Sequence, residues 1–430
     1  MGKNMQLNRR QLLSGIAGVL TFPHVVVSSA LGKTGTAAPS ERITMGTIGV
    51  GGRGRQILQA LMGHSDCRML AVCDVDSRRL DQGRDIVNSK YGNSDCAAYS
   101  DYRELLARDD IDALLIASPD QWHVLQSVEA ARAGKDIYLE KPLGLSVAED
   151  VALREAIKKY NRVFQFGTQQ RSGRNFRFAC ELVRNGRIGR LRTIIAATPA
   201  SRIVDSYRPS RVPPELDYEM WIGPARWMPY TQGVVGSCGN WGHISNFSLG
   251  WITTWGIHHV DIAQWGNDAD RSGPVEIEGS GEFPKDGLYD CAVAWDVKLK
   301  YANGATLNFV DNKKHRQGVL FRGDEGWVFV RRGAIEAEPK SLLTERIGPE
   351  ETHLANSSDH AGNFLDCVKS RSTPVSSIDS AVHTDTLCHL SDIAMRLSRR
   401  LRWDPKSERF IDDDQANRML CRSMRSPWHL

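Results

Sequence analysis

A glycine-rich segment near residue 50 has the residue types and spacing that hold the phosphates of a dinucleotide. Its members are Gly49, Gly51, Gly52, Arg53 and Gly54. An apolar run at 43–50 precedes them and apolar residues recur at helical spacing over 57–62, so the glycines lie at a strand-to-helix turn. Gly49 permits the tight turn, Gly51 lets the backbone approach a pyrophosphate, and Gly54 lets the helix pack on the strand. The amides at the helix N-terminus then face the phosphates.

A carboxylate follows the second predicted strand, where it would meet the ribose of such a cofactor. That strand covers 69–73 and leads into Asp74, which stands 20 residues after Gly54. A carboxylate there accepts hydrogen bonds from the ribose hydroxyls and repels a 2′-phosphate. Arg78 and Arg79 follow closely and offset part of that repulsion. NAD is therefore the expected cofactor, and NADP is the less favoured alternative.

The elements that must position these residues are predicted as alternating strands and helices. Strands are expected at 113–117 and 137–139, and a helix between them at 122–133 ends at Gly134. This alternation is typical of a doubly wound parallel sheet, in which ligands bind at the loops after the strand C-termini. Two such loops supply further predicted cofactor contacts, which are Ser118, Pro119, Trp122, His123, Glu140 and Lys141.

Together these features resemble the Gfo/Idh/MocA family, named for glucose-fructose oxidoreductase and inositol dehydrogenase. The resemblance rests on the glycine motif, on Asp74, on the Pro-containing loop near 119 and on Glu-Lys-Pro at 140–142. Further matches follow in order: FGTQQRS (166–172), FRFACELVRNGRIGRL (176–191), GIHHVDIAQWG (256–266), NFLDCVKSR (363–371) and WDPKSERF (403–410). They cover nearly the whole chain after its first residues, and the likeness is greatest to exported members with a twin-arginine signal.

The resemblance implies which residues act on a substrate. Lys141 would reach the substrate hydroxyl or carbonyl beside the nicotinamide and move its proton, and His258 would assist. His259 is a weaker candidate, since adjacent helical residues point about 100° apart. Gln169 and Arg171 follow a predicted strand end and are candidates for contacts with substrate hydroxyls.

One departure from the family concerns its proton relay. Many relatives have an aspartate four residues before the histidine, whereas this sequence has Thr254, and Phe247 stands where relatives often have tyrosine. Thr254 can donate a hydrogen bond to substrate but is no carboxylate. Either Lys141 and His258 suffice, or the substrate differs, or catalysis is weaker.

Aromatic residues point to the substrate class. Six of the eleven tryptophans lie between 221 and 265, and aromatic faces pack well on the C–H faces of sugar rings. We expect a carbohydrate or cyclitol substrate, although at least half of these tryptophans should belong to the core or to an interface. Three functions remain open: a CH–OH oxidoreductase, a glycoside hydrolase or lyase that works through a transient keto-sugar, and a non-catalytic cofactor-binding homologue.

The fold class expected is α/β, in two domains. A Rossmann domain at 42–166 precedes an α+β domain at 167–430, in which strands are predicted at 191–198, 275–282, 291–301, 304–311 and 318–330. The resemblance implies that these strands form a large open, mainly antiparallel sheet, whose exposed face commonly forms homodimers or homotetramers.

The N-terminus predicts export. Arg9 and Arg10 precede an uncharged stretch that ends near small residues at 28–30, which resembles a twin-arginine signal peptide at 1–30, followed by a linker at 31–41. The expected location is periplasmic or otherwise exported through the twin-arginine machinery, with a membrane tether if the signal is not cleaved.

Composition excludes other classes of partner. Formal net charge is +4, and only +1 once the three basic residues of 1–30 are set aside (52 basic against 51 acidic), which gives no electrostatic case for nucleic acid. Nine cysteines without a CxxC pair predict neither a zinc site nor a disulfide framework, and no metal is expected.

Overall fold

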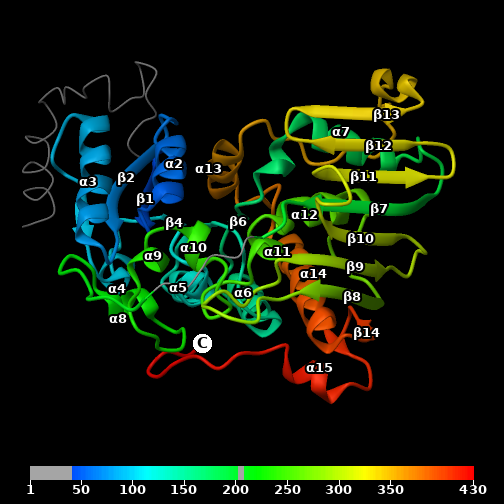
Figure 1. Cartoon of the computed structure of the whole chain (residues 1–430). Helices are drawn as coiled ribbons and strands as arrows, with labels where there is room; N and C mark the ends of the chain where they lie inside the picture. The colour runs from blue at the N-terminus through cyan, green and yellow to red at the C-terminus, as the bar shows by residue number, and fades with distance from the viewer. Residues whose placement is uncertain (1–40, 202–207) are drawn as a thin grey trace, which may run out of the picture. The chain divides into compact units, whose positions relative to one another are not determined.

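The computed structural model describes residues 41–201 and 208–430. The predicted signal at 1–30 and all but the last residue of the predicted linker at 31–41 lie outside the described residues. Residues 43–430 form one compact unit that contains two β-sheets (Figure 1). Within the described ranges, no helix combines the length and apolar character that crossing a membrane would require.

The first sheet is parallel, with six strands in the order β3-β2-β1-β4-β5-β6. Its strands are β1 (Ile43–Ile48), β2 (Cys67–Cys73), β3 (Ala97–Tyr99), β4 (Ala113–Ile116), β5 (Asp136–Leu139) and β6 (Phe164–Phe166). Because β1 pairs with β2 on one side and β4 on the other, the winding reverses between β1 and β4, and a crevice opens there at the strand C-termini. The predicted doubly wound parallel sheet is confirmed.

Helices pack on both faces of this sheet. They are α2 (Gly52–Leu61), α3 (Ser77–Tyr91), α4 (Tyr102–Leu106), α5 (Asp120–Arg132), α6 (Val147–Lys159) and α13 (His360–Ser370). Alternate residues of β4 belong to two cores: Leu115 packs in the core that includes α2 and α13, whereas Leu114 and Ile116 pack in the core that includes α5 and α6. α13 comes from the C-terminal part of the chain and lies against α2 (Figure 1).

The second sheet has nine strands in the order β13-β12-β11-β7-β10-β9-β8-β14-β15. Its strands are β7 (Leu191–Thr198), β8 (Glu276–Glu282), β9 (Ala294–Lys300), β10 (Thr306–Asp311), β11 (Gly318–Gly323), β12 (Trp327–Arg331), β13 (Ala334–Glu338), β14 (Leu401–Asp404) and β15 (Arg409–Phe410). β7 and β10 pair in parallel and the other neighbours are antiparallel, which confirms the expected mainly antiparallel sheet.

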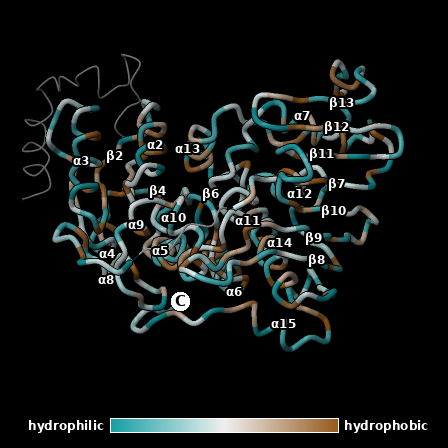
Figure 2. Tube along the Cα trace, viewed as in Figure 1, coloured by the Kyte–Doolittle hydropathy of each residue, from teal (hydrophilic) through white to brown (hydrophobic). Residues whose placement is uncertain are grey.

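The predicted run at 318–330 is two strands, β11 and β12. The chain turns between them, and the Gly323 N–H donates to the Gly326 carbonyl (2.9 Å). The strands of this sheet carry both hydrophobic and hydrophilic residues (Figure 2). Successive side chains of a strand point to opposite faces, so that one face packs on the helices.

Helices α7 (Arg174–Arg184), α12 (Gly256–Gly266) and α14 (Ile378–Leu397) pack together on one face of the second sheet. Glycines bring α12 unusually close to that sheet. A Cβ on Gly256 would lie 2.4 Å from the Phe309 ring, and one on Gly266 would lie 2.5 Å from the Phe321 ring. This tight contact sets the position of every side chain on α12.

The segment at 208–255 carries four short helices. They are α8 (Tyr218–Ile222), α9 (Gln232–Val235), α10 (Cys238–Trp241) and α11 (Trp251–Thr254). It has a small core of its own, in which the Trp221 and Phe247 rings lie 4.9 Å apart. It packs on α5, where Trp122 Nε1 donates to the Met220 carbonyl (3.0 Å). The remaining helices are η3 (Gln169–Ser172), η4 (Lys340–Thr344) and α15 (Asp414–Arg418).

Candidate active site

The glycine-rich turn between β1 and α2 is shaped by close backbone contacts. Gly49 has a φ of +85°, and a Cβ there would lie 2.6 Å from the backbone of Ala117. A Cβ on Gly54 would lie 2.0 Å from the Gly49 carbonyl oxygen, whereas one on Gly52 would meet nothing within 4 Å. α2 has no side-chain cap and no acidic residue in its first turn. The turn therefore leaves both space and helix N–H groups for a phosphate.

Asp74 lies directly after β2 and is tied to this turn. One carboxylate oxygen accepts from the Val50 N–H (2.9 Å) and the other from the Asp76 N–H (3.0 Å). Burial raises the pKa of Asp74, although these N–H groups and the charge of Arg79 oppose the shift. Each carboxylate oxygen has a second lone pair, so Asp74 retains acceptor capacity for ribose hydroxyls.

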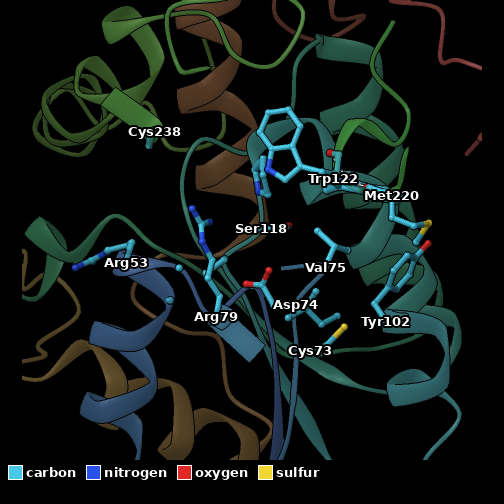
Figure 3. Close-up of a pocket in the computed structure, with 18 of the residues that line it drawn as sticks. Arg53, Cys73, Asp74, Val75, Arg79, Tyr102, Ser118, Trp122, Met220 and Cys238 are labelled. Carbon is cyan, nitrogen blue, oxygen red and sulfur yellow. Dashed lines mark hydrogen bonds between the residues drawn. The ribbon is translucent and has the colours of Figure 1, made fainter. Parts of the chain in front are cut away.

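A cavity of about 450 Å³ opens over the glycine turn and Asp74 (Figure 3). Most of the predicted cofactor contacts line it: Gly49, Gly51, Gly52, Arg53, Gly54, Asp74, Ser118, Pro119 and Trp122. Arg79 also lines it, whereas the Arg78 guanidinium pairs with Glu215 (2.7 Å). The shape and chemistry of these residues fit an extended dinucleotide.

Two residues predicted to contact the cofactor hold loops together instead. His123 is buried, and its ring nitrogens lie 2.6 Å from the Pro142 carbonyl and 2.9 Å from the Ser118 carbonyl. Glu140 is 3% exposed and accepts from Arg53 Nε (3.0 Å) and Gln169 Nε2 (3.0 Å). Because neither residue lines the cavity over the glycine turn, we correct both to positioning residues.

Lys141 lies in the loop after β5, and its side chain lines a second cavity. Its Nζ donates to the backbone carbonyl of Thr254 (2.9 Å), at the end of α11. The loop that follows is anchored from α14, since Asp385 accepts from the N–H groups of Leu143 (3.0 Å) and Gly144 (3.1 Å). Lys141 is thus held between a loop after β5 and a helix more than a hundred residues later.

The second cavity has a volume of about 590 Å³. Its lining combines cations, amides and aromatic rings: Arg53, Lys141, Gln169, Gln170, Gly173, Phe176, Trp251, Thr254, Trp255, His258, Arg332 and Gly333. Arg53 lines the first cavity as well, so the two cavities meet at this residue. A ring-shaped substrate in the second cavity would lie next to a dinucleotide in the first.

His258 lies on α12 and lines the second cavity. Its Nδ1 is buried and makes no hydrogen bond within the described ranges, and the same holds for the Thr254 hydroxyl. Burial and the neighbouring charges of Lys141 and Arg332 lower the pKa of His258 well below its ordinary value. The ring is therefore neutral, and it offers a hydrogen bond to substrate rather than a positive charge.

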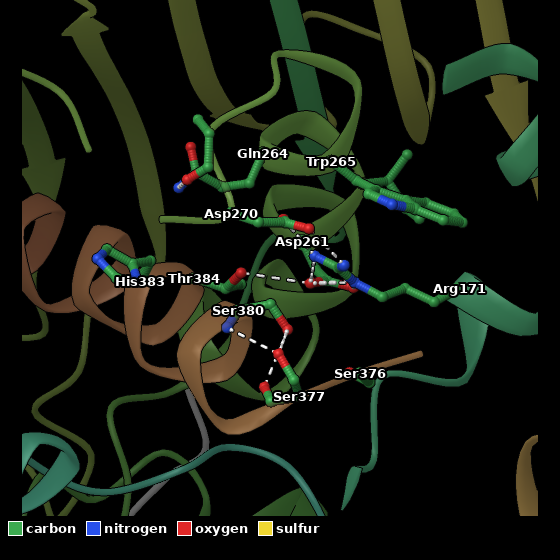
Figure 4. Close-up of polar contacts among 12 residues, drawn as sticks. Arg171, Asp261, Gln264, Trp265, Asp270, Ser376, Ser377, Ser380, His383 and Thr384 are labelled. Carbon is green, nitrogen blue, oxygen red and sulfur yellow. Dashed lines mark hydrogen bonds and ion pairs between the residues drawn. The ribbon is translucent and has the colours of Figure 1, made fainter. Parts of the chain in front are cut away.

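Two predicted substrate contacts lie elsewhere. Arg171 is 2% exposed and pairs with Asp261 (2.7 Å) and Asp270 (2.7 Å), as Figure 4 shows. Burial opposes its charge, but the two carboxylates raise the pKa of Arg171. His259 faces the second sheet, where Nδ1 lies 2.8 Å from the Ala197 carbonyl. We correct both to residues that fix α12 in place.

The sequence analysis did not predict several residues that line the two cavities. Met220, Trp221, Cys238 and Trp241 come from the 208–255 segment and close over the first cavity. Arg332 reaches the second cavity from the turn after β12. The tryptophan-rich composition of the segment was a signal for the former, but no local pattern distinguished Arg332 from other surface arginines.

Comparison with known proteins decides the family. Residues 43–168 match the oxidoreductase family model for the NAD-binding Rossmann fold, and residues 204–430 match the model for the C-terminal alpha/beta domain of the same family. The chain belongs to the Gfo/Idh/MocA oxidoreductases. It is therefore an NAD(P)-dependent oxidoreductase, and its first domain is the NAD-binding domain.

Individual relatives agree with this assignment. An uncharacterized oxidoreductase, YrbE, from Bacillus subtilis is 31% identical over 314 residues, which are 72% of this chain and 77% of that protein. A protein named glycosyl hydrolase family 109 from Shewanella pealeana is 29% identical over 44% of this chain and 45% of its own length. The crystal structure of aldose-aldose oxidoreductase from Caulobacter crescentus shares the fold, with a TM-score of 0.63 and 19% identity over 84% of this chain and 99% of that chain.

Proposed function

We propose that this member of the Gfo/Idh/MocA family transfers a hydride between NAD and a secondary alcohol or ketone carbon of a sugar, glycoside or cyclitol. The observation that carries the proposal is the placement of Lys141. Its amine is held by the Thr254 carbonyl in a cavity walled by Trp251 and Trp255, and that cavity shares Arg53 with the NAD cavity. A proton-transferring group, a sugar-sized space and the cofactor site thus adjoin one another.

Bound NAD supplies a hydride acceptor, and NADH a donor, for the substrate carbon. The protein must therefore manage the proton. As the alcohol is oxidised, its O–H bond breaks and the Lys141 amine takes the proton; in the reverse direction the ammonium returns it to the ketone oxygen. Neutral His258 positions the same oxygen by a hydrogen bond, and the rings of Trp251 and Trp255 contact the apolar face of the substrate.

Position 254 carries threonine instead of the aspartate that many relatives have, but the hydrogen bond that holds the Lys141 side chain is still made. The contact uses the backbone carbonyl of Thr254, which any residue at this position provides. The carboxylate of the family relay is still absent, so proton exchange with solvent depends on Lys141 and His258.

A sugar screen tests the proposal. Purified protein with NAD is offered aldoses, glycosides and cyclitols, and the absorbance of NADH is followed; the reverse reaction uses keto-sugars with NADH. We expect turnover with at least one substrate and its loss in Lys141→Met, whose NAD affinity should match the wild type. Turnover that survives in Lys141→Met would remove the assigned proton carrier.

A second candidate is net glycoside hydrolysis on the same site, favoured by the relatives named glycosyl hydrolase family 109. Transient oxidation to a keto-sugar acidifies the neighbouring C–H, the aglycone leaves by elimination, water adds, and the hydride returns. This reaction needs NAD that does not dissociate. Near-stoichiometric NAD(H) released on denaturation, with glycoside cleavage and no net NADH, would support it over simple dehydrogenation.

We also propose export through the twin-arginine pathway, supported by the Arg9-Arg10 pair and the stretch that follows it. Replacing both arginines by lysine should retain the protein in the cytoplasm in a fractionation experiment. A homodimer or homotetramer, proposed from the large open sheet, is tested by light scattering of the purified protein.

A further inference from the structure

The second cavity carries an unbalanced positive charge. Arg53, Lys141 and Arg332 line it, and its lining contains no aspartate or glutamate. Two buried carboxylates outside the lining act on these cations: Glu140 pairs with Arg53 (3.0 Å), and Asp120 interacts with Lys141. Within the described residues, Arg332 forms no salt bridge, although the charge of Glu140 acts on it.

The same cations act on His258, which lies in this cavity. Besides burial, the groups that lower its pKa are Lys141, Arg332, His259 and Arg53, and all of these except His259 line the cavity. A neutral sugar would leave this field uncompensated, whereas an anionic group would be attracted to it.

Arg332 is held in a fixed orientation. Its guanidinium lies over the Trp255 ring, 4.8 Å from the centroid. With the Gln170 amide oriented to satisfy its neighbours, its oxygen accepts from Arg332 Nε (3.3 Å) and its nitrogen donates to the His258 carbonyl (2.7 Å). Among the described residues, no hydrogen bond or ion pair uses the two terminal nitrogens, and their planar fork matches a carboxylate or phosphate.

Lys141 and Arg332 come from different sheets. Lys141 follows β5 of the first sheet, while Arg332 follows β12 of the second. An occupant of the cavity can therefore meet both at once, with a hydroxyl at Lys141 and a charged substituent at Arg332.

We propose that the substrate is an anionic sugar, a uronate or a sugar phosphate, and that Arg332 selects it by pairing with its carboxylate or phosphate. The location of the reacting carbon rests on the proposed function above, whereas the charge preference concerns binding alone. Arg332 is then a specificity-determining residue, and removing it should abolish the preference without removing the proton carrier.

The test compares ligands that differ in charge and little in size. D-Glucuronate, its neutral isostere D-glucuronamide, D-glucose and D-glucose 6-phosphate are titrated into the NAD-bound protein, and binding is followed by calorimetry. We expect glucuronate or the phosphate to bind about 10- to 100-fold more tightly than its neutral counterpart. The carboxylate and phosphate arms identify which anion is preferred.

Variants locate the preference. Arg332→Met should bring charged and neutral ligands to similar affinity, and Arg332→Lys should restore part of the difference. Arg331→Met is the matched control, because Arg331 is the adjacent arginine and is exposed like Arg332, but it lies outside the cavity lining and should keep the full preference. Tight binding of NAD to every variant verifies that each one is folded.

Equal or weaker binding of both anions relative to the neutral ligands would overturn the proposal, as would a preference that survives in Arg332→Met. Binding of none of the four ligands overturns it too. Selective anion binding without hydride transfer would support this inference and contradict the proposed function. Oxidation of neutral sugars without any charge preference would support the proposed function and contradict this inference.

Discussion

The two adjoining cavities are built in different ways. The phosphate-binding part of the NAD cavity comes from one continuous stretch, in which β1, the glycine turn and the start of α2 shape the backbone. The second cavity takes Lys141 from the loop after β5, His258 from α12 and Arg332 from the turn after β12. The first is therefore sensitive to local backbone changes, and the second to distant contacts that hold its parts in register.

The largest expected effect is loss of the proposed proton carrier, Lys141, in the second cavity. Lys141→Ala should lower kcat/KM by about 10²- to 10⁴-fold, because the substrate oxygen loses its proton partner. NAD affinity, measured by fluorescence titration, should stay unchanged, since Lys141 does not line the NAD cavity. A parallel loss of NAD affinity would mean that the two cavities are not separable in this way.

The next effect concerns the buried ion pairs behind α12. Arg171→Met leaves the carboxylate of Asp261, which is 0% exposed, without its partner, and should cost about 3–5 kcal/mol of unfolding free energy. Thermal unfolding checks this. The control is Arg192→Met, which breaks the exposed pair with Asp324 and should leave Tm nearly unchanged. Equal Tm values for the two variants would contradict the supporting role of Arg171.

The glycine turn offers a matched pair of substitutions. Gly54→Ala places a methyl group 2.0 Å from the Gly49 carbonyl oxygen and should destabilise the fold by roughly 2–3 kcal/mol. Gly52→Ala meets nothing within 4 Å and should fold normally, yet lose NAD affinity because the methyl group occupies the phosphate space. Denaturant unfolding and NAD titration separate the two. Wild-type NAD affinity in Gly52→Ala would place the phosphates elsewhere.

A further prediction concerns the pH dependence of the support beneath the Lys141 loop. His389 Nε2 lies 3.3 Å from Asp150 and 3.6 Å from Asp385, the residue that anchors Leu143 and Gly144. Burial opposes the charged ring, but the two carboxylates outweigh it and raise the pKa of His389 to about 10.

The sign of this dependence follows from linkage. A folded-state pKa above the unfolded value of about 6.5 means that the stabilisation is complete below pH 6.5 and is lost as the pH rises towards 10. Tm of the wild type should fall over this range, and less so in His389→Gln. Parallel curves for the two proteins would show that the ring does not titrate as expected.

Local sequence patterns were sufficient for much of the molecule. Strand β7 (Leu191–Thr198) was predicted to the residue, and the glycine turn and Asp74 lie together as expected, because GxGxxG and a strand-terminal acid encode one turn and its neighbour. The run at 318–330 was predicted less well: the polar and glycine residues at 322–326 (RGDEG) mark the turn that separates β11 from β12, and the prediction ran through them.

The roles of side chains were predictable only where one contiguous segment of the sequence forms the site. The sequence alone determined the NAD-binding turn, the parallel sheet around it and, through the family motifs, the presence of Lys141 and His258 in a site. The tertiary structure decided that Arg171, His123 and His259 are occupied by internal partners and that Arg332 faces the substrate space. The physical reason is that burial and pairing depend on residues far away in sequence, whose positions are set when α12 and α14 pack on the second sheet.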